Sequence, residues 1–125
     1  MKRTNFQIDD WLYVAGKPMQ VKAVHQKKLG FHHIPTKLDW YRFGELEPIL
    51  LTDEILEKNF KKMNHGFQIG TCWKIWKNAN YGYILATLTI DEFCGGSYEP
   101  CIPCTYLHEL QHLITDLRIE KKIEL

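Results

Sequence analysis

The chain has 125 residues, 45% of them hydrophobic and 25% charged, which is the balance of a globular domain and excludes a disordered chain. Sixteen Lys and Arg against fifteen Asp and Glu leave a net charge of +1, so the overall balance does not indicate a polyanionic partner. The apolar runs are shorter than the roughly 18 residues that span a bilayer, so we expect no membrane partner. We predict a single domain over 1–125, with subdomains at 1–51 and 52–125.

The first residues of the chain and its cysteines indicate in which cellular compartment the protein is expected. Met1-Lys2-Arg3 is followed by a polar stretch and not by the apolar core of a signal peptide. In a chain without an export signal, the four cysteines are expected as reduced thiols or metal ligands. These features predict a cytoplasmic protein.

The charges are unevenly distributed along the chain. Residues 1–42 contain eight Lys and Arg against three Asp, which gives +5 there and −4 over the remainder. A basic half of this kind is typical of a surface for nucleic acid or an acidic protein, although solvated surface on a small β unit gives the same pattern.

The first half of the chain reads as short strands separated by turns. Gly16-Lys17-Pro18 and residues 26–30 have the composition of turns, and Pro35 ends a strand. Several short strands at close spacing predict a small curled antiparallel sheet or SH3-like barrel. The expected strands are 10–15, 19–25, 31–35, 39–43 and 47–51.

The second half reads as a helix–hairpin–helix unit. Thr52 has the character of an N-cap, followed by a short helix with Asp53 and Glu54 at its positive end. Alternating apolar residues over 67–75 and 83–90 predict a long antiparallel hairpin. Residues 91–103 read as a Gly- and Pro-containing connection, 103–117 as a helix, and 118–125 as either a strand or a frayed end. The fold class predicted is α+β.

The last helix is amphipathic and carries the sequence His108-Glu109-Leu110-Gln111-His112. Leucine and isoleucine side chains recur at the spacing of one helical face, with His108 and His112 on the other. We therefore expect the leucine face on the core and the two imidazoles in solvent.

The H-E-x-x-H spacing admits a zinc interpretation. Imidazoles one turn apart can take adjacent corners of a tetrahedral zinc site, with Glu109 as general base on a metal-bound water. In these five residues the segment resembles the zincin metallopeptidases, but the further ligands of that pattern are missing, and only Cys94 or Cys104 could supply a third ligand from upstream. A structural zinc site combining the histidines with Cys101 and Cys104 is a second possibility. We favour the solvated face of an amphipathic helix.

Aromatic and basic residues suggest a binding surface. Trp40, Tyr41 and Arg42 are consecutive, and Trp76 falls on the polar parity of its strand. Side chains of this kind can form a platform for a peptide or for bases. These residues are the predicted binding site.

Over its length the chain resembles small uncharacterised proteins encoded by Bacteroidetes and their phages and mobile elements. The matching stretches are 10–21, 45–59 and Tyr106 to His112 with the charged tail, and they cover about half of the chain. The resemblance implies no activity. The leading hypothesis is a non-enzymatic binding or adaptor module with a protein partner, nucleic acid being the other candidate, and without a cofactor. The alternative is a small zinc-dependent hydrolase using the histidine motif.

Overall fold

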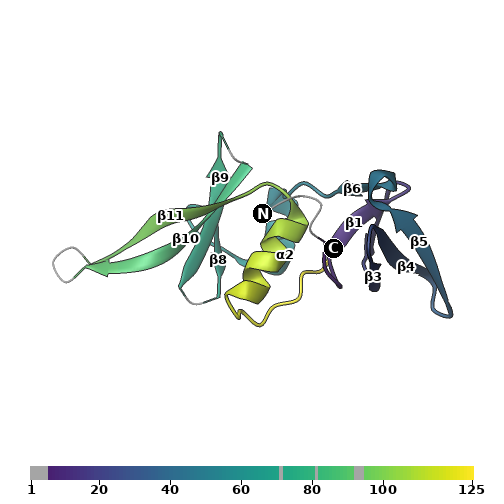
Figure 1. Cartoon of the computed structure of the whole chain (residues 1–125). Helices are drawn as coiled ribbons and strands as arrows, with labels where there is room; N and C mark the ends of the chain where they lie inside the picture. Colours follow the sequence, from purple (N-terminus) through teal and green to yellow (C-terminus); the bar gives the residue numbers. More distant parts are fainter. Residues whose placement is uncertain (1–5, 71, 81, 92–94) are drawn as a thin grey trace. The chain divides into compact units, whose positions relative to one another are not determined.

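The computed structural model describes residues 6–70, 72–80, 82–91 and 95–125, and side chains within 88–101 are not described. The chain divides into two compact units, residues 1–50 with 106–113 and residues 51–105 with 114–125. Strands grouped in antiparallel sheets combine with two α-helices within the described residues (Figure 1). The predicted α+β class with an N-terminal β unit is confirmed. The first unit also takes in residues 106–113, which the predicted boundary at 51/52 did not provide for.

The first unit contains two antiparallel sheets, with strand orders β2-β1-β6 and β3-β4-β5 (Figure 1). The turn between β1 and β2 is made by Ala15 and Gly16, both with positive φ. An apolar cluster that includes Leu12, Val21 and Phe31 forms the core, and burying each such side chain contributes about 1.5–3 kcal/mol. The strands are β1 (Trp11–Val14), β2 (Lys17–Gln20), β3 (Ala23–His25), β4 (Lys28–Ile34), β5 (Lys37–Arg42) and β6 (Leu46–Pro48).

The single strand predicted over 19–25 is wrong, because the chain passes from one sheet to the other at Val21. Val21 is fully buried, and its backbone bonds to the segment before β1: its N–H donates to the Asp10 carbonyl at 2.9 Å, and its carbonyl accepts from the Asp9 N–H at 2.8 Å. Lys22 N–H already donates to the Gly30 carbonyl of the other sheet.

The second unit is built on an antiparallel sheet with strand order β11-β10-β9-β8-β7 (Figure 1). The predicted hairpin is confirmed as β9 and β10, with Trp76 opposite Ile84. The strand expected over 67–75 is divided into β8 and β9 after Gly70, whose φ is +62°. The elements are α1 (Asp53–Asn59), β7 (Lys61–Lys62), β8 (Phe67–Ile69), β9 (Trp73–Asn78), β10 (Gly82–Asp91) and β11 (Gly95–Cys104).

Strand β11 replaces most of the connection predicted over 91–103. It pairs with β10, placing Pro100 opposite Ala86 and Pro103 opposite Ile84. Proline cannot donate to a ladder and is tolerated on an edge strand, and β11 lies at the edge of its sheet. The prediction of a connection over 91–103 is therefore wrong for residues 95–103, where the prolines lie on an edge strand.

Helix α1 begins as predicted, with Thr52 Oγ1 accepting the Ile55 N–H at 3.3 Å. Its other end anchors the C-terminal segment, because Asn59 is buried and bonds to both backbone groups of Glu124. Asn59 Nδ2 donates to the Glu124 carbonyl at 2.8 Å, and Asn59 Oδ1 accepts its N–H at 2.7 Å. This explains why residues 118–125 are neither a strand nor a free end.

Helix α2 (Leu107–Asp116) is shorter than the helix predicted over 103–117, because Pro103 and Cys104 belong to β11. Residues Leu107 to Leu113 of the helix belong to the first unit. Among the described residues, no helix combines the length and apolar character required to cross a membrane.

Candidate functional site

The two histidines of α2 are buried, so the prediction that they face solvent is wrong. His108 is 0% exposed and His112 is 2% exposed. Leu107 and Leu110 are fully buried as expected, so helical periodicity located the apolar face correctly. Helical periodicity did not reveal that the two histidines on the opposite face are buried as well.

His112 contacts a carboxylate from the segment that precedes β1. Its Nε2 lies 2.6 Å from Asp10 Oδ2, and the Asp10 side chain is 3% exposed. The same carboxylate oxygen accepts the Gln7 N–H at 2.8 Å. An ionised carboxylate only accepts hydrogen bonds, so in that state Nε2 carries the proton of this contact.

Glu109 stabilises the beginning of the helix. Its Oε1 accepts the backbone N–H of Tyr106 at 2.9 Å. Tyr106 immediately precedes α2 and Glu109 is the third residue within it, which is the glutamate half of a capping box. The carboxylate that the zinc interpretation assigns as general base thus satisfies an N–H at the helix terminus.

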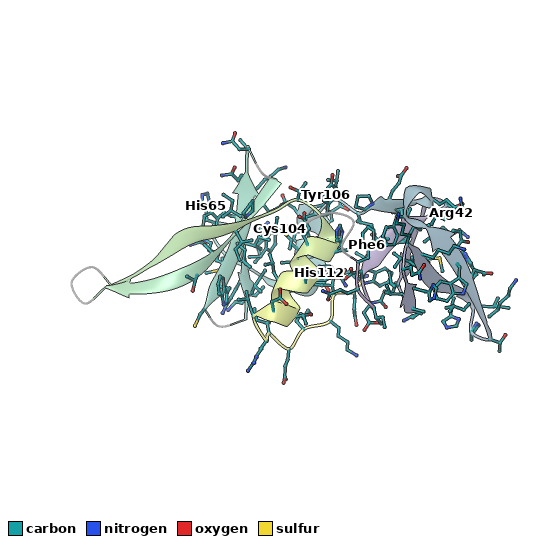
Figure 2. The ribbon with its side chains drawn as sticks, viewed as in Figure 1. Phe6, Arg42, His65, Cys104, Tyr106 and His112 are labelled. Atoms are coloured by element: carbon teal, nitrogen blue, oxygen red, sulfur yellow. The ribbon has the colours of Figure 1, made fainter. Side chains whose placement is uncertain are left out.

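His108 lies among aromatic rings. Its ring stacks on Tyr106 with centroids 5.9 Å apart and an interplanar angle of 19°. It also contacts Phe6 at 5.1 Å and the edge of His112 at 5.7 Å. We call Phe6, Asp10, Tyr106, His108 and His112 the histidine cluster; Figure 2 labels Phe6, Tyr106 and His112.

Gln111 ties the same helix to the backbone at the start of β1. Its Oε1 accepts the Trp11 N–H and its Nε2 donates to the Asp9 carbonyl, both at 2.8 Å. Glu109, Gln111 and His112 therefore all make structural contacts within the first unit, and those of Gln111 and His112 attach α2 to residues 9–11.

The metal interpretations concern these same residues. In the part of the chain that the structure describes, no group of three or more His, Cys, Asp and Glu side chains is arranged to hold a metal ion. To act in zinc hydrolysis, Glu109 would have to leave the Tyr106 N–H, and His112 would have to leave Asp10 or share zinc with it. Of the cysteines proposed as ligands, Cys104 is buried at the end of β11, while Cys94 and the side chain of Cys101 lie outside the described residues.

A second candidate site lies on the sheet β3-β4-β5. Strand register places His25, Lys28 and Arg42 in one row across the sheet, and Ala23, Gly30 and Trp40 in the next row. Side chains alternate between the faces of a strand, so these two rows share one face. We call it the outer face, defined by Ala23, His25, Lys28, Gly30, Trp40 and Arg42.

Shallow depressions on the outer face are lined by basic and aromatic side chains. One, of about 510 Å³, is lined by His25, Gln26, Lys27 and Lys28. A neighbouring depression is lined by His25, Lys28 and Trp40, and another includes Lys28 and Arg42. Lys28 borders each of them, so they form one basic region.

The predicted binding residues are distributed over different places. Trp40 is 45% exposed and shares the outer face with Arg42, which Figure 2 labels on β5. Tyr41 has the opposite parity: its ring packs edge-on against Phe31 at 5.9 Å, and its hydroxyl lies 2.5 Å from His33 Nε2. Tyr41 thus adjoins the core, and its hydroxyl end reaches the exposed His33.

Trp76 belongs to the second unit. It lies on β9, with Lys74 Nζ 5.8 Å from its ring centroid. It borders a depression of about 220 Å³ that is also lined by His65 and Lys77. Trp76 therefore borders a mixed polar depression of the second unit, whereas the outer face belongs to the first unit.

Sequence reasoning did not place Lys28 and His25 on the surface that carries Trp40 and Arg42. It assigned residues 26–30 to a turn, whereas the turn is Gln26-Lys27 alone, with Gln26 at φ +50°, and β4 begins at Lys28. A strand begun at Lys28 would have placed Lys28 and Gly30 on one face. The available signal was the apolar alternation of Leu29 and Phe31.

Tyr83, in the second unit, has a phenol whose pKa is raised. Its hydroxyl donates to Asp53 Oδ1 at 2.5 Å, and the side chain is buried. Burial raises the pKa of the phenol far above its ordinary value, and the hydrogen bond and the charge of Asp53 raise it further. A phenol so stabilised in its neutral form anchors β10 to the beginning of α1.

No protein-family model matches this sequence, and no similar curated protein or solved structure is found.

Proposed function

We propose that the chain is a non-enzymatic binding module that recognises a negatively charged partner through the outer face. The observation that carries the proposal is the half-exposed indole of Trp40 beside the cross-strand row of His25, Lys28 and Arg42. Tryptophan and arginine are enriched at interfaces, so an exposed indole beside this row of cations suits recognition of a partner.

The histidine motif supports a non-enzymatic reading. Glu109 and His112 each make a contact that explains their presence in the fold, the first at the helix terminus and the second with Asp10. The binding function therefore draws on the outer face, and the motif serves to attach α2.

Nuclear magnetic resonance titration tests where binding occurs. Labelled protein is titrated with three polyanions: an oligothymidine, a glutamate-rich peptide and heparin. We expect at least one of them to shift the Trp40 indole signal and the amides of Ala23 and Gly30, while signals of α1 remain in place. Shifts confined to other surfaces, or the absence of shifts with all three, would contradict the proposal.

A further inference from the structure

The outer face is positively charged, and the neighbouring carboxylates of Asp39 and Glu45 make other contacts. Among the described residues that line its depressions, none is acidic. Asp39 has the opposite parity on β5 and pairs with Lys37 at 3.5 Å. The carboxylate of Glu45 accepts the Arg42 backbone N–H at 2.9 Å. The face therefore suits phosphate or carboxylate groups.

Trp40 has the surroundings of a stacking platform. Its cross-strand neighbour Gly30 has no side chain, and Ala23, the next residue in the row, has only a methyl group. His25 meets the indole edge-on, with centroids 6.2 Å apart and an interplanar angle of 73°. The residue at position 30 must be small, since an added Cβ would lie 3.0 Å from the Leu38 side chain. Leu38, which has the same parity on β5 as Trp40, covers Gly30, while the indole itself remains 45% exposed and available to a flat ligand.

Building on the proposed function, we propose that the partner of the outer face is single-stranded nucleic acid. Trp40 stacks on one base, while Lys28, Arg42 and Lys27 of the β3–β4 turn contact the flanking phosphates. Single-strand binding sites combine these two components, a basic track and an aromatic ring for the bases.

The combination of groups separates this partner from other anions. Bases in a duplex are already stacked on each other, so the Trp40 ring finds a flat partner only in an unpaired strand. An acidic peptide would neutralise the cations but would leave the indole without a stacking partner. The aromatic and basic components together are what favour nucleic acid.

The number of cations sets the expected salt dependence. Each phosphate contacted on a single strand contributes about −0.7 to the slope of log K against log salt. Contacts from Lys27, Lys28 and Arg42 therefore predict a slope of roughly −2. Stacking on Trp40 predicts that its loss weakens binding by roughly 5- to 150-fold.

Fluorescence anisotropy of the full chain with a labelled oligothymidine of about 12 nucleotides tests the inference, at salt concentrations from about 50 to 200 mM. We expect Trp40→Ala to weaken binding by the factor above and Trp40→Phe to retain most of it. Lys28→Ala combined with Arg42→Ala should reduce the slope by roughly 1.4. The matched control removes the same charge from the second unit, as Lys58→Ala with Lys61→Ala, and should leave the slope within about 0.3 of wild type.

Other probes distinguish failure of this inference from failure of the binding module. Equal binding of a duplex of the same sequence, or an effect of Trp40→Ala below twofold, would overturn the stacking assignment. If a glutamate-rich peptide binds through the outer face and the oligothymidine does not, the nucleic-acid inference falls and the binding module stands. If the oligothymidine, the glutamate-rich peptide and heparin all fail to bind through the outer face, both proposals fall. Circular dichroism of each variant verifies that the fold is retained.

Discussion

Replacing Asp10 and His112 with alanine, singly and together, tests whether their buried contact stabilises the first unit. Both residues are 2% exposed, and the atoms that join them lie 2.6 Å apart. Asp10→Ala removes the acceptor of two hydrogen bonds, from His112 and from the Gln7 N–H. At about 1.5 kcal/mol for each bond to a charged group, the free energy of unfolding should fall by about 3 kcal/mol.

His112→Ala should lower the free energy of unfolding somewhat more, by about 4 kcal/mol. It removes one hydrogen bond, leaves a cavity and leaves the Asp10 carboxylate buried without this partner. The double variant removes the contact only once. We therefore expect it to lose about 5 kcal/mol, with a coupling energy of about 2 kcal/mol between the two sites.

Urea unfolding measures these differences, with amide hydrogen exchange in β1 reporting on the first unit alone. Asp9→Asn is the matched control: the Asp9 side chain is exposed, its 4.0 Å ion pair with Lys22 is weak, and asparagine tolerates the φ of +74° at that position. The control should change stability by less than about 0.5 kcal/mol. Strictly additive losses in the double variant would refute the reasoning.

The same preparations, purified without a histidine tag, address the zinc alternative. If the histidine cluster is structural, a chelator leaves the unfolding midpoint of wild type unchanged. Stoichiometric zinc in the wild type that is lost in His108→Ala and His112→Ala would instead support a metal site, and a chelator would then lower the midpoint.

Two further predictions concern the second unit and a glycine. The pKa of Tyr83 is raised in the folded state, so the contribution of its neutral phenol to the free energy of unfolding is fully present below the ordinary phenol pKa of about 10 and is lost as pH rises above it. Tyr83→Phe should therefore lower the free energy of unfolding by about 1.5 kcal/mol at neutral pH. The same variant should show a smaller loss of stability at alkaline pH than wild type, as measured by urea unfolding. Gly66 has φ +89°, and a Cβ there would collide with the Ile75 carbonyl, so Gly66→Ala should cost at least about 2 kcal/mol in the same assay. Gly44→Ala, which meets open space, should stay within about 0.5 kcal/mol; equal effects at both glycines would contradict this account.

The chain itself carries enough local information for several elements. Alternation predicted the β9–β10 hairpin, and a hydroxyl before an acidic turn predicted the Thr52 cap of α1. These features depend on neighbours in sequence or on a short turn, where periodicity and capping chemistry act directly. The apolar face of α2 was recovered for the same reason.

The pairing of strands that are distant in sequence could not be predicted from such local patterns. β11 was missed because prolines and glycines read as a loop, and only its position at the edge of the sheet makes them tolerable. The row of Lys28 and Arg42 likewise depends on strand register, because a shift of one residue would put Lys28 on the opposite face.

The sequence by itself determined the α+β class, the amphipathic pattern of the last helix and the presence of aromatic and basic residues in the first half. Only the tertiary structure decided what surrounds them. His112 was predicted to face water, yet it contacts Asp10, which lies 102 positions away along the chain. A helical wheel identifies the face on which a polar side chain lies, but the solvent or carboxylate that meets this face is supplied by a distant segment. For that physical reason a motif of five residues could suggest zinc chemistry while its side chains make the contacts that attach a helix.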